Sequence, residues 1–342
     1  MSSYATLNGE TRLLVIIGDP IAQVKSPAGI TESLLDRGRN AVLVPIHVTP
    51  ADVDGFIHGA SLAKNLDSIV VTVPHKFAAY RHCATATDRA HFLGAVNVMR
   101  RNADGSWHGD MCDGEAFVNG IRIAGCKPAG SRALVVGAGG AGSAIALALL
   151  DAGAAELAAH DSDIARRDAL LGRLNTKYPG KAHAGSADPG GYGVIVNATP
   201  AGMRAEDPYP VAADKLTREM FVGDVITAPA VTPLIEAARR LGCGTQVGGG
   251  MFAAVRDLIL DFRSSPGRWR VDRVVRRLAV DSAQSACSRG RRYDSQPGQP
   301  PCPACDARCA AQRNSCISSL TCGNLHPHTG AVLAEADKIR AR

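Results

Sequence analysis

Apolar residues gather in short runs along the first 262 residues, and these runs alternate with longer segments of mixed polarity. Runs suited to strands lie at Leu13–Ile17, Ala41–Ile46, Ile69–Val73, Ala133–Val136, Glu156–His160, Val194–Asn197 and Met220–Val225. Segments with helical character lie at 28–38, 51–64, 115–124, 141–153, 163–176 and 232–241. Repeated strand–helix alternation predicts parallel sheets in an α/β fold. A change to a more regular pattern near 110–116 indicates a second domain.

The third run continues as "IVVTVPHK" at residues 69–76. An apolar run of this length is typical of a strand that is covered on both faces. Proline cannot continue a central strand, so Pro74 marks the exit and Lys76 follows at the carboxyl end. Ligands of open α/β sheets bind at that edge. Lys76 is therefore a candidate site residue, and the alternative is a solvated lysine in a loop.

A glycine-rich turn stands in "RALVVGAGGAGSAIALALLDAG", after an apolar run and before an Ala/Leu helix. Gly137, Gly139 and Gly142 match G-x-G-x-x-G, which predicts a dinucleotide site with the pyrophosphate at the helix N-terminus. Asp161 lies 19 residues after Gly142, at the end of the next run, where an acid would bind the ribose hydroxyls. The alternative is a glycine turn that serves helix packing alone.

Charge divides the chain into two parts. Residues 1–262 carry 24 Lys and Arg against 26 Asp and Glu, whereas residues 263–342 carry 14 against 6. The main part shows no basic stripe of the kind that nucleic-acid-binding proteins need. We see no signal peptide at the N-terminus and no apolar run of about 18 residues, so neither secretion nor a membrane span is expected. A cytoplasmic location is the default expectation.

Cysteine follows the same division, because six of the ten cysteines lie between residues 287 and 322. Cys302, Cys305 and Cys309 form one knuckle, and further candidate ligands follow unevenly at Cys316, Cys322, His326 and His328. Structural zinc sites usually show two paired knuckles, so no metal is expected here. Disorder of this Ser/Pro/Gly-rich segment is favoured. A reading-frame error near residue 263 is the remaining alternative.

Eight motifs occur in order along residues 12–262. They are "GDPIAQVKSP", "VTVPHK", "GAVNVMRR", "GDMCDG", "GAGGAG", "NATPAGM", "APAVTPLIEAARRLG" and "GGGMF". Together they resemble the shikimate dehydrogenase family, including its quinate/shikimate and shikimate-dehydrogenase-like branches.

The resemblance implies a two-domain α/β fold with an N-terminal substrate domain and a Rossmann-type dinucleotide-binding domain. The substrate domain would span residues 1–112 and be completed by a helix at about 249–263. The cofactor domain would span 113–248, and 264–342 would form a basic, Cys/Pro/Ser-rich tail. The implied activity is reversible hydride transfer between NAD(P) and a shikimate- or quinate-like hydroxy acid.

The resemblance also assigns roles to residues. Lys76 would be catalytic and take the hydroxyl proton of the substrate, with Asp113 paired to it. Thr72, Asn97, Ser26 and Lys25 would bind the substrate. Asp113 could instead cap the helix that follows it, and Ser26 could be a cap or turn residue before Pro27. The implied cofactor site comprises Gly137, Ala138, Gly139, Gly140, Ala141, Gly142, Asp161, Asn197, Thr199, Val225 and Gly248.

Cofactor choice is predicted from the end of the second strand of the cofactor domain. Many family members carry Asn-Arg-Thr there, with the arginine on the 2′-phosphate of NADP, whereas this chain has His160, Asp161 and Ser162. A carboxylate would bind both ribose hydroxyls of NAD and repel a phosphate. We therefore predict NAD over NADP by at least roughly tenfold. Arg166 and Arg167 are the counterargument, since either could reach a 2′-phosphate.

Several positions depart from the family pattern. Val24 replaces a serine that binds the substrate carboxylate, Met111 and Cys112 replace Asn and Thr, Thr227 replaces a tyrosine, and Val255 replaces a glutamine. Each change removes a polar contact to a hydroxylated acid, which indicates a substrate related to shikimate but differently substituted. Cys112 is interpreted as a small packing residue. The alternative function is a non-catalytic ligand-sensing or regulatory protein on the same fold.

Overall fold

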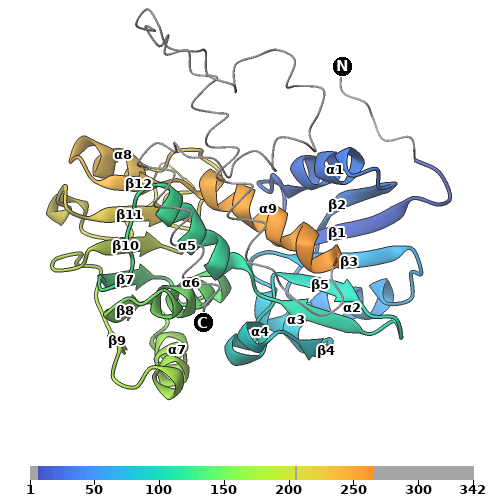
Figure 1. Cartoon of the computed structure of the whole chain (residues 1–342), viewed down its shortest axis with the longest axis horizontal. Coiled ribbons are helices and arrows are strands. Elements are labelled where there is room, and N and C mark those ends of the chain that lie inside the picture. The colour runs from blue at the N-terminus through green and yellow to red at the C-terminus, as the bar shows by residue number, and fades with distance from the viewer. Residues whose placement is uncertain (1–6, 205, 265–342) are drawn as a thin grey trace, which may run out of the picture. The chain divides into compact units, whose positions relative to one another are not determined.

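The computed structural model describes residues 7–204 and 206–264, and that part of the chain holds two six-stranded sheets (Figure 1). The predicted tail after Ser264 lies outside the described residues, together with its candidate zinc ligands. Each sheet is built from one half of the described sequence, because β1–β6 form the first and β7–β12 form the second.

The first sheet is mixed. Its strands are β1 (Arg12–Gly18), β2 (Ala41–His47), β3 (Leu66–Val71), β4 (Cys83–Ala86), β5 (Val98–Arg101) and β6 (Trp107–Asp110), in the order β2-β1-β3-β5-β6-β4. β5 runs antiparallel to both β3 and β6. The prediction of parallel sheets alone is therefore wrong for this half. Only residues 102–106 separate β5 from β6, and a connection this short joins antiparallel strands.

The second sheet is parallel throughout. It comprises β7 (Arg132–Val136), β8 (Glu156–His160), β9 (Ala182–Ala184), β10 (Val194–Asn197), β11 (Phe221–Asp224) and β12 (Gly244–Gln246), in the order β12-β11-β10-β7-β8-β9. This is the strand order of dinucleotide-binding folds, with its reversal between β7 and β10. Leu134, Ile195 and Val222 lie in its core and are fully buried.

The helices follow the strands closely in sequence. They are α1 (Ser26–Asp36), α2 (Val53–Ala60), α3 (Lys76–Tyr80), α4 (Asp88–Leu93), α5 (Asp113–Ile123), α6 (Gly140–Asp151), α7 (Ile164–Lys177), α8 (Pro233–Arg240) and α9 (Gly248–Ser264), with a 3₁₀ turn at Ala213–Lys215. The seven predicted strands and six predicted helices are all present, within a few residues of their expected bounds. The mixed α/β fold is confirmed.

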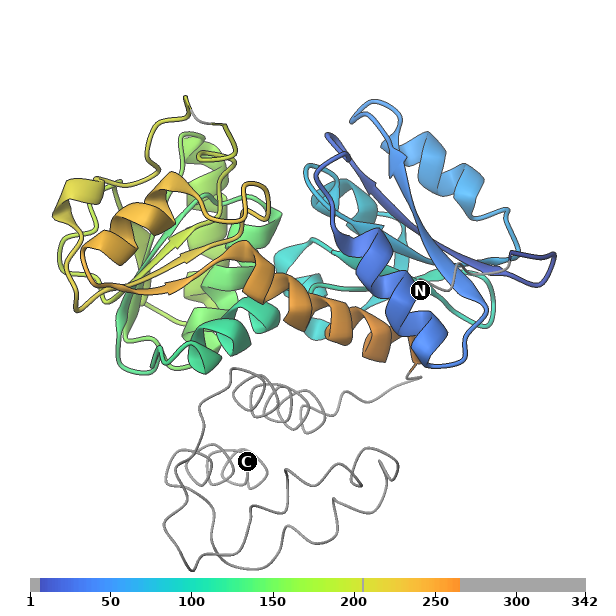
Figure 2. The same ribbon diagram turned by 90° about the horizontal axis from the view of Figure 1, so that it is seen from above.

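Two helices pack across elements that are distant in sequence. α5 contacts α6 and α9, and α9 also contacts α1 and β5. Figure 2 shows α1 and α9 side by side, where Phe252 packs near Gly29. These contacts join the last described helix to the N-terminal half of the chain. The proposed domain boundaries at 112 and 248 stay a prediction.

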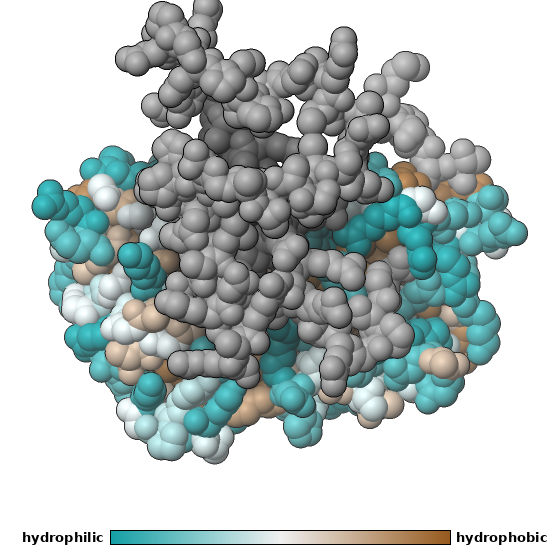
Figure 3. All heavy atoms as spheres, in the orientation of Figure 1, coloured by the Kyte–Doolittle hydropathy of each residue, from teal (hydrophilic) through white to brown (hydrophobic). Residues whose placement is uncertain are grey.

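Within the described residues, the large exposed apolar side chains are distributed over separate parts of the chain. Large exposed apolar residues belong to separate segments, and they are Leu7, Val44, Leu62, Val73, Ile123, Ile164, Tyr209 and Leu241. Hydrophilic and hydrophobic residues are interspersed over the visible parts of the face drawn in Figure 3. Among residues 7–204 and 206–264, no helix has the length and apolar character needed to cross a membrane.

Candidate active site

Lys76 lies just beyond the carboxyl end of β3, as predicted. The strand ends at Val71, a short turn follows, and Lys76 is the first residue of α3. The neighbouring His75 is buried, and its Nε2 lies 2.7 Å from the carbonyl oxygen of Val48. The carbonyl oxygen of Lys76 accepts a hydrogen bond of 3.0 Å from the N–H of Val96. Hydrogen bonds on both sides of the turn thus hold the lysine backbone in place.

Asp113 is the partner of Lys76. The Lys76 Nζ donates to Asp113 Oδ2, and the two side chains are 13% and 7% exposed. Asp113 is the first residue of α5, and the N-cap position belongs to Cys112. The alternative of a helix N-cap at Asp113 is therefore wrong. The structure instead directs this carboxylate to a buried ion pair, which can exchange a proton with a hydroxyl group placed beside it.

Asn97 is buried and holds Asp113 from the other side. Its Nδ2 donates to Asp113 Oδ1 at 2.7 Å and to Cys112 Sγ at 3.2 Å, and its Oδ1 accepts from the Cys112 N–H at 3.0 Å. Both side-chain amide hydrogens of Asn97 are thus donated to groups of this protein. Contact of Asn97 with a substrate hydroxyl stays a prediction. Burial and the neighbouring carboxylates raise the pKa of the Cys112 thiol, which fits the predicted packing role.

The glycine-rich turn lies between β7 and α6, beside the point where the strand order reverses. Gly137 has a φ of +102°, which other residues rarely adopt. A Cβ on Gly142 would lie 1.8 Å from the carbonyl oxygen of Gly137, so this close packing requires glycine. A Cβ on Gly139 would meet nothing within 4 Å. Open space at Gly139 and the free N-terminus of α6 fit the pyrophosphate of a dinucleotide.

Gly140, the third glycine of this turn, brings Lys76 and the dinucleotide turn together. A Cβ on Gly140 would lie 2.8 Å from Lys76 Cδ and 3.0 Å from Lys76 Cβ. The lysine side chain therefore packs directly on the first residue of α6. A hydroxyl group at Lys76 Nζ would lie beside the turn that fits the dinucleotide, an arrangement suited to proton and hydride transfer at one carbon.

Comparison with known proteins identifies the family. A family model described as the shikimate dehydrogenase substrate binding domain matches residues 16–99. A shikimate dehydrogenase (NADP(+)) of Rubrobacter xylanophilus is 38% identical over 248 residues, which cover 70% of this chain and 86% of the relative. The chain belongs to the shikimate dehydrogenase family. As a member it is an oxidoreductase.

Two further matches extend over similar lengths. A shikimate dehydrogenase (NADP(+)) of Acidiphilium cryptum is 35% identical, over 72% of this chain and 87% of the relative. The structure of shikimate 5-dehydrogenase from Listeria monocytogenes in complex with shikimate and NAD superposes with a TM-score of 0.68. That pair shares 25% identity and covers 81% of this chain and 99% of the other. The agreement includes the Rossmann-type sheet, so the fold of the family is confirmed.

The predicted preference for NAD over NADP is wrong. The similar shikimate dehydrogenases, including those of Rubrobacter and Acidiphilium, are NADP(+) enzymes. The structure offers a physical reason at Asp161, whose side chain is only 4% exposed. Its carboxylate accepts the N–H of Ala138 at 2.6 Å and that of Asp163 at 2.8 Å. It also accepts from Arg166 Nη2 at 2.6 Å and Nε at 3.1 Å. The Asp161 carboxylate, which the sequence assigns to the ribose hydroxyls of NAD, is therefore already hydrogen-bonded within the chain.

The remaining predicted cofactor residues gather at the carboxyl ends of β10 and β11. Asn197 Oδ1 accepts from the Thr199 N–H at 3.0 Å, and Asn197 Nδ2 donates to Asp224 Oδ2 at 3.2 Å. The carbonyl oxygen of Asn197 accepts from the Val225 N–H at 3.2 Å. A Cβ on Gly248 would lie 2.2 Å from the carbonyl oxygen of Ile226. The structure thus brings these residues together, and their contact with a cofactor stays a prediction.

The predicted substrate residues of the N-terminal half are less closely joined. Thr72 lies at the ends of β1 and β3, where its N–H donates to the carbonyl oxygen of Ile17 at 2.9 Å. Lys25 is the N-cap residue of α1, Ser26 is its first residue, and no side-chain cap bond is present. Within the described residues no hydrogen bond joins Lys25 or Ser26 to Lys76, so their substrate role stays a prediction.

Sequence reasoning missed the contact between Gly140 and Lys76. The available signal was a glycine that G-x-G-x-x-G does not require, at the third position after Gly137. It also missed the arginine that holds the turn before Asp113, because Arg89 stands in no motif. In the described part of the chain, no group of three or more His, Cys, Asp or Glu side chains could hold a metal ion.

Proposed function

We propose that this protein catalyses the reversible, NADP-dependent oxidation of shikimate to 3-dehydroshikimate. The observation that carries the proposal is the buried Lys76–Asp113 pair packed against Gly140 of the dinucleotide turn. The names of the similar enzymes support shikimate as the substrate, rather than the differently substituted acid that the departures from the family pattern indicate, and NADP(+) as the cofactor.

In the oxidation direction, the unprotonated amine of Lys76 takes the proton of the ring hydroxyl. The carbinol hydrogen leaves with its electron pair, and the carbon–oxygen bond becomes a carbonyl. The nicotinamide supplies the hydride acceptor when it is bound. Asp113 holds the Lys76 Nζ beside the hydroxyl, and Asn97 holds the Asp113 carboxylate. In the reduction direction the Lys76 ammonium returns the proton.

Arg166 is the residue that we assign to the 2′-phosphate of NADP. It follows β8 at the start of α7, its side chain is 45% exposed, and it already approaches Asp161. The hydrogen bonds that Arg166 donates to Asp161 raise the pKa of Arg166 and keep the guanidinium charged. A phosphate could share this guanidinium, since an arginine offers five N–H donors. Arg167 instead pairs with Asp168.

The first experiment tests catalysis with shikimate and quinate as alcohols, followed by NADPH absorbance. Lys76→Met keeps the methylenes that pack on Gly140 and removes the amine. We expect kcat for shikimate to fall about 10²–10⁴-fold, with the Kd for NADPH changed less than about threefold. The matched control is Lys64→Met, at an exposed lysine before β3. Near-normal turnover by Lys76→Met would contradict the proposal.

The second experiment tests the cofactor. We expect kcat/KM with NADP to exceed that with NAD by at least about tenfold, which corresponds to about 1.4 kcal/mol. Arg166→Met should lower the ratio of kcat/KM with NADP to kcat/KM with NAD, because NADP binds more weakly. Arg167→Met should leave this ratio unchanged. An equal preference in the wild-type protein, or an unchanged ratio in Arg166→Met, would remove this assignment.

A further inference from the structure

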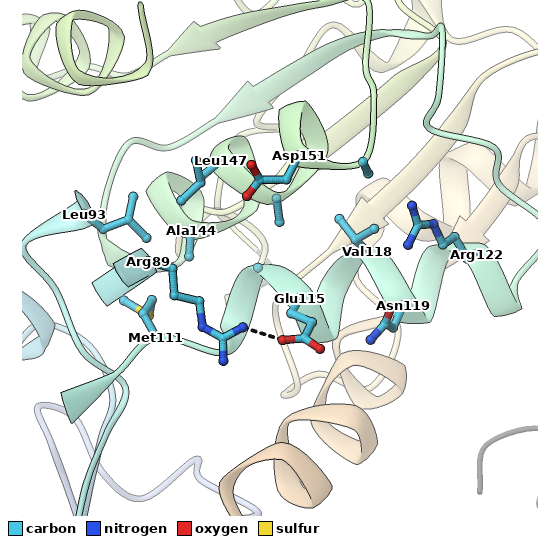
Figure 4. Close-up of a pocket in the computed structure, with 13 residues that line it drawn as sticks. Arg89, Leu93, Met111, Glu115, Val118, Asn119, Arg122, Ala144, Leu147 and Asp151 are labelled. Atoms are coloured by element: carbon cyan, nitrogen blue, oxygen red, sulfur yellow. Dashed lines mark hydrogen bonds and ion pairs between the residues drawn. The ribbon is translucent and has the colours of Figure 1, made fainter. Parts of the chain in front are cut away.

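Arg89 lies in α4 and bridges two carboxylates on either side of Asp113 in the sequence. Its Nε donates to Asp110 Oδ1 at 2.7 Å and its Nη2 donates to Asp110 Oδ2 at 2.6 Å. Its Nη1 donates to Glu115 Oε2, and Figure 4 shows this contact. Burial alone would lower the pKa of Arg89, but the two carboxylates outweigh it and raise the pKa above its usual value. The guanidinium therefore stays charged.

Asp110 is the deeper of the two partners. It is fully buried at the end of β6, and its Oδ1 also accepts from Thr87 Oγ1 at 2.5 Å and from the Met111 N–H at 2.8 Å. Its carbonyl oxygen accepts from the Asn97 N–H at 2.9 Å. The carboxylate of Asp110 thus ties α4 to the start of the turn that leads to Asp113.

Glu115 lies in the first turn of α5, two residues after Asp113. One guanidinium therefore holds both the segment that enters the turn and the helix that leaves it. The planar group of arginine can bind two carboxylates at once with a fixed geometry, which a lysine cannot do. The position of the Asp113 carboxylate depends on both attachments.

We propose that Arg89 is a positioning residue for the reaction, which fixes residues 110–115 so that the Asp113 carboxylate meets Lys76 Nζ. This inference rests on the proposed function, in which Lys76 and Asp113 handle the proton. Arg89 itself acts through Asp110 and Glu115.

The ion pairs of Arg89 with Asp110 and with Glu115 should contribute unequally to the position of Asp113. Asp110 is fully buried, whereas the Glu115 side chain is 21% exposed. Glu115 also borders a cavity of about 240 Å³ between α4, α5 and α6, which Leu93, Met111, Val118 and Leu147 line as well (Figure 4). Ion pairs near water contribute little, and a buried carboxylate that loses its partner costs much more. The Asp110 attachment should therefore dominate.

The test compares steady-state kinetics of the full-length protein with shikimate and NADP. Arg89→Met should lower kcat about 10²-fold, the loss typical of a misplacement near 1 Å, while KM and the Kd for NADPH change less than about threefold. Arg89→Lys keeps a charge opposite Asp110 and should recover about tenfold of that loss. Glu115→Gln should lower kcat less than about threefold.

Two controls separate positioning from folding. Arg101→Met removes another arginine, which donates to the carbonyl oxygens of Ser61 and Leu66 at the opposite end of β3, and it should leave kcat unchanged. The double variant Arg89→Met/Asp110→Asn removes the buried charge together with its partner. Its melting temperature should be closer to that of the wild type than the melting temperature of Arg89→Met is. Its kcat should stay at least about tenfold below the wild-type value.

Any one of three results would overturn the inference. In the first, kcat recovers together with stability in the double variant. In the second, Arg101→Met loses as much kcat as Arg89→Met. In the third, Lys76→Met is inactive and Arg89→Met turns over normally. If Arg89→Met does not fold, the double variant and Arg89→Lys decide the question. Normal turnover by Lys76→Met would instead contradict the proposed function. Failure of the proposed function is thus distinguishable from failure of the inference about Arg89.

Discussion

Gly140→Ala tests the contact that joins the dinucleotide turn to the lysine. The added methyl would lie 2.8 Å from Lys76 Cδ, 3.0 Å from its Cβ and 3.4 Å from its Cγ. Carbon atoms pack at about 3.5–4.0 Å, so the lysine and the methyl must separate by about 0.7 Å or more. The nearest atoms belong to the stem of the lysine and not to its mobile end. A shift there moves Nζ relative to Asp113.

The magnitude follows from this displacement. A misplacement of about 1 Å can cost 10²-fold in rate, so we expect kcat to fall about 10–100-fold. The free energy of unfolding should fall by about 0–2.5 kcal/mol, because overpacking costs about 1–3 kcal/mol and replacing glycine in a helix returns about 0.5–1 kcal/mol. Steady-state assays with shikimate and NADP would measure kcat, and urea unfolding would measure the free energy of unfolding.

Gly172→Ala is the matched control. Gly172 lies within α7, and a Cβ there would meet nothing within 4 Å. This variant should be more stable by about 0.5–1 kcal/mol, with unchanged kcat. If Gly140→Ala keeps wild-type kcat, Lys76 does not need its contact with α6. That result would refute the reasoning from this geometry.

Three further predictions concern stability, pH and reactivity. Phe117→Ala should lower the free energy of unfolding by about 3–5 kcal/mol in urea titrations, because Phe117 is fully buried, and a loss below about 1 kcal/mol would contradict its core role. Burial alone would raise the pKa of Asp161, but hydrogen bonds from Arg166 and from backbone N–H groups outweigh it and lower the pKa. The stability that Asp161 contributes is therefore present above the unfolded pKa of about 3.9 and is lost as pH falls through the lower folded value. In thermal melts, Asp161→Asn should reduce the fall of the melting temperature at acid pH. An unchanged fall would contradict this contribution of Asp161. Cys112, whose pKa is raised by burial, should resist alkylation at pH 8 until the protein unfolds, and rapid labelling on peptide mapping would argue otherwise.

Seven strands and six helices were predictable, in their chain order, from local pattern alone. In the second sheet β7, β8 and β11 are each followed by an α-helix, and a helical crossover of this kind joins parallel neighbours. The short strands β4, β5 and β6 were missed because their residues lack a continuous apolar run, as in "CATA" and "WHGD". Their pairing depends on a five-residue connection and on neighbours distant in sequence.

The resemblance placed Lys76, Asn97 and Asp113 at one site, and the structure brings the three together. Lys76 and Asp113 each open a helix just after a strand, and Asn97 directly precedes β5, which runs antiparallel to β3, so the three side chains converge at one edge of the sheet. Apart from the Lys76–Asp113 pair, which the resemblance implied, the partner of each polar atom was not readable. The Asn97 amide is directed to Asp113 and Cys112, and this geometry depends on the path of the turn that Arg89 holds.

The sequence by itself determined the alternating elements and the glycines that the turn requires, because both follow from local sterics and periodicity. The positions of the candidate catalytic groups came from the motifs shared with the family. The resemblance implied the pair of Lys76 and Asp113, and only the tertiary structure decided which other charges meet. Asp161 was assigned to a ribose from its spacing, yet it lies against Arg166 and the N–H of Ala138. Electrostatic partnership depends on distances of a few ångströms between side chains on different elements, and sequence spacing does not determine those distances.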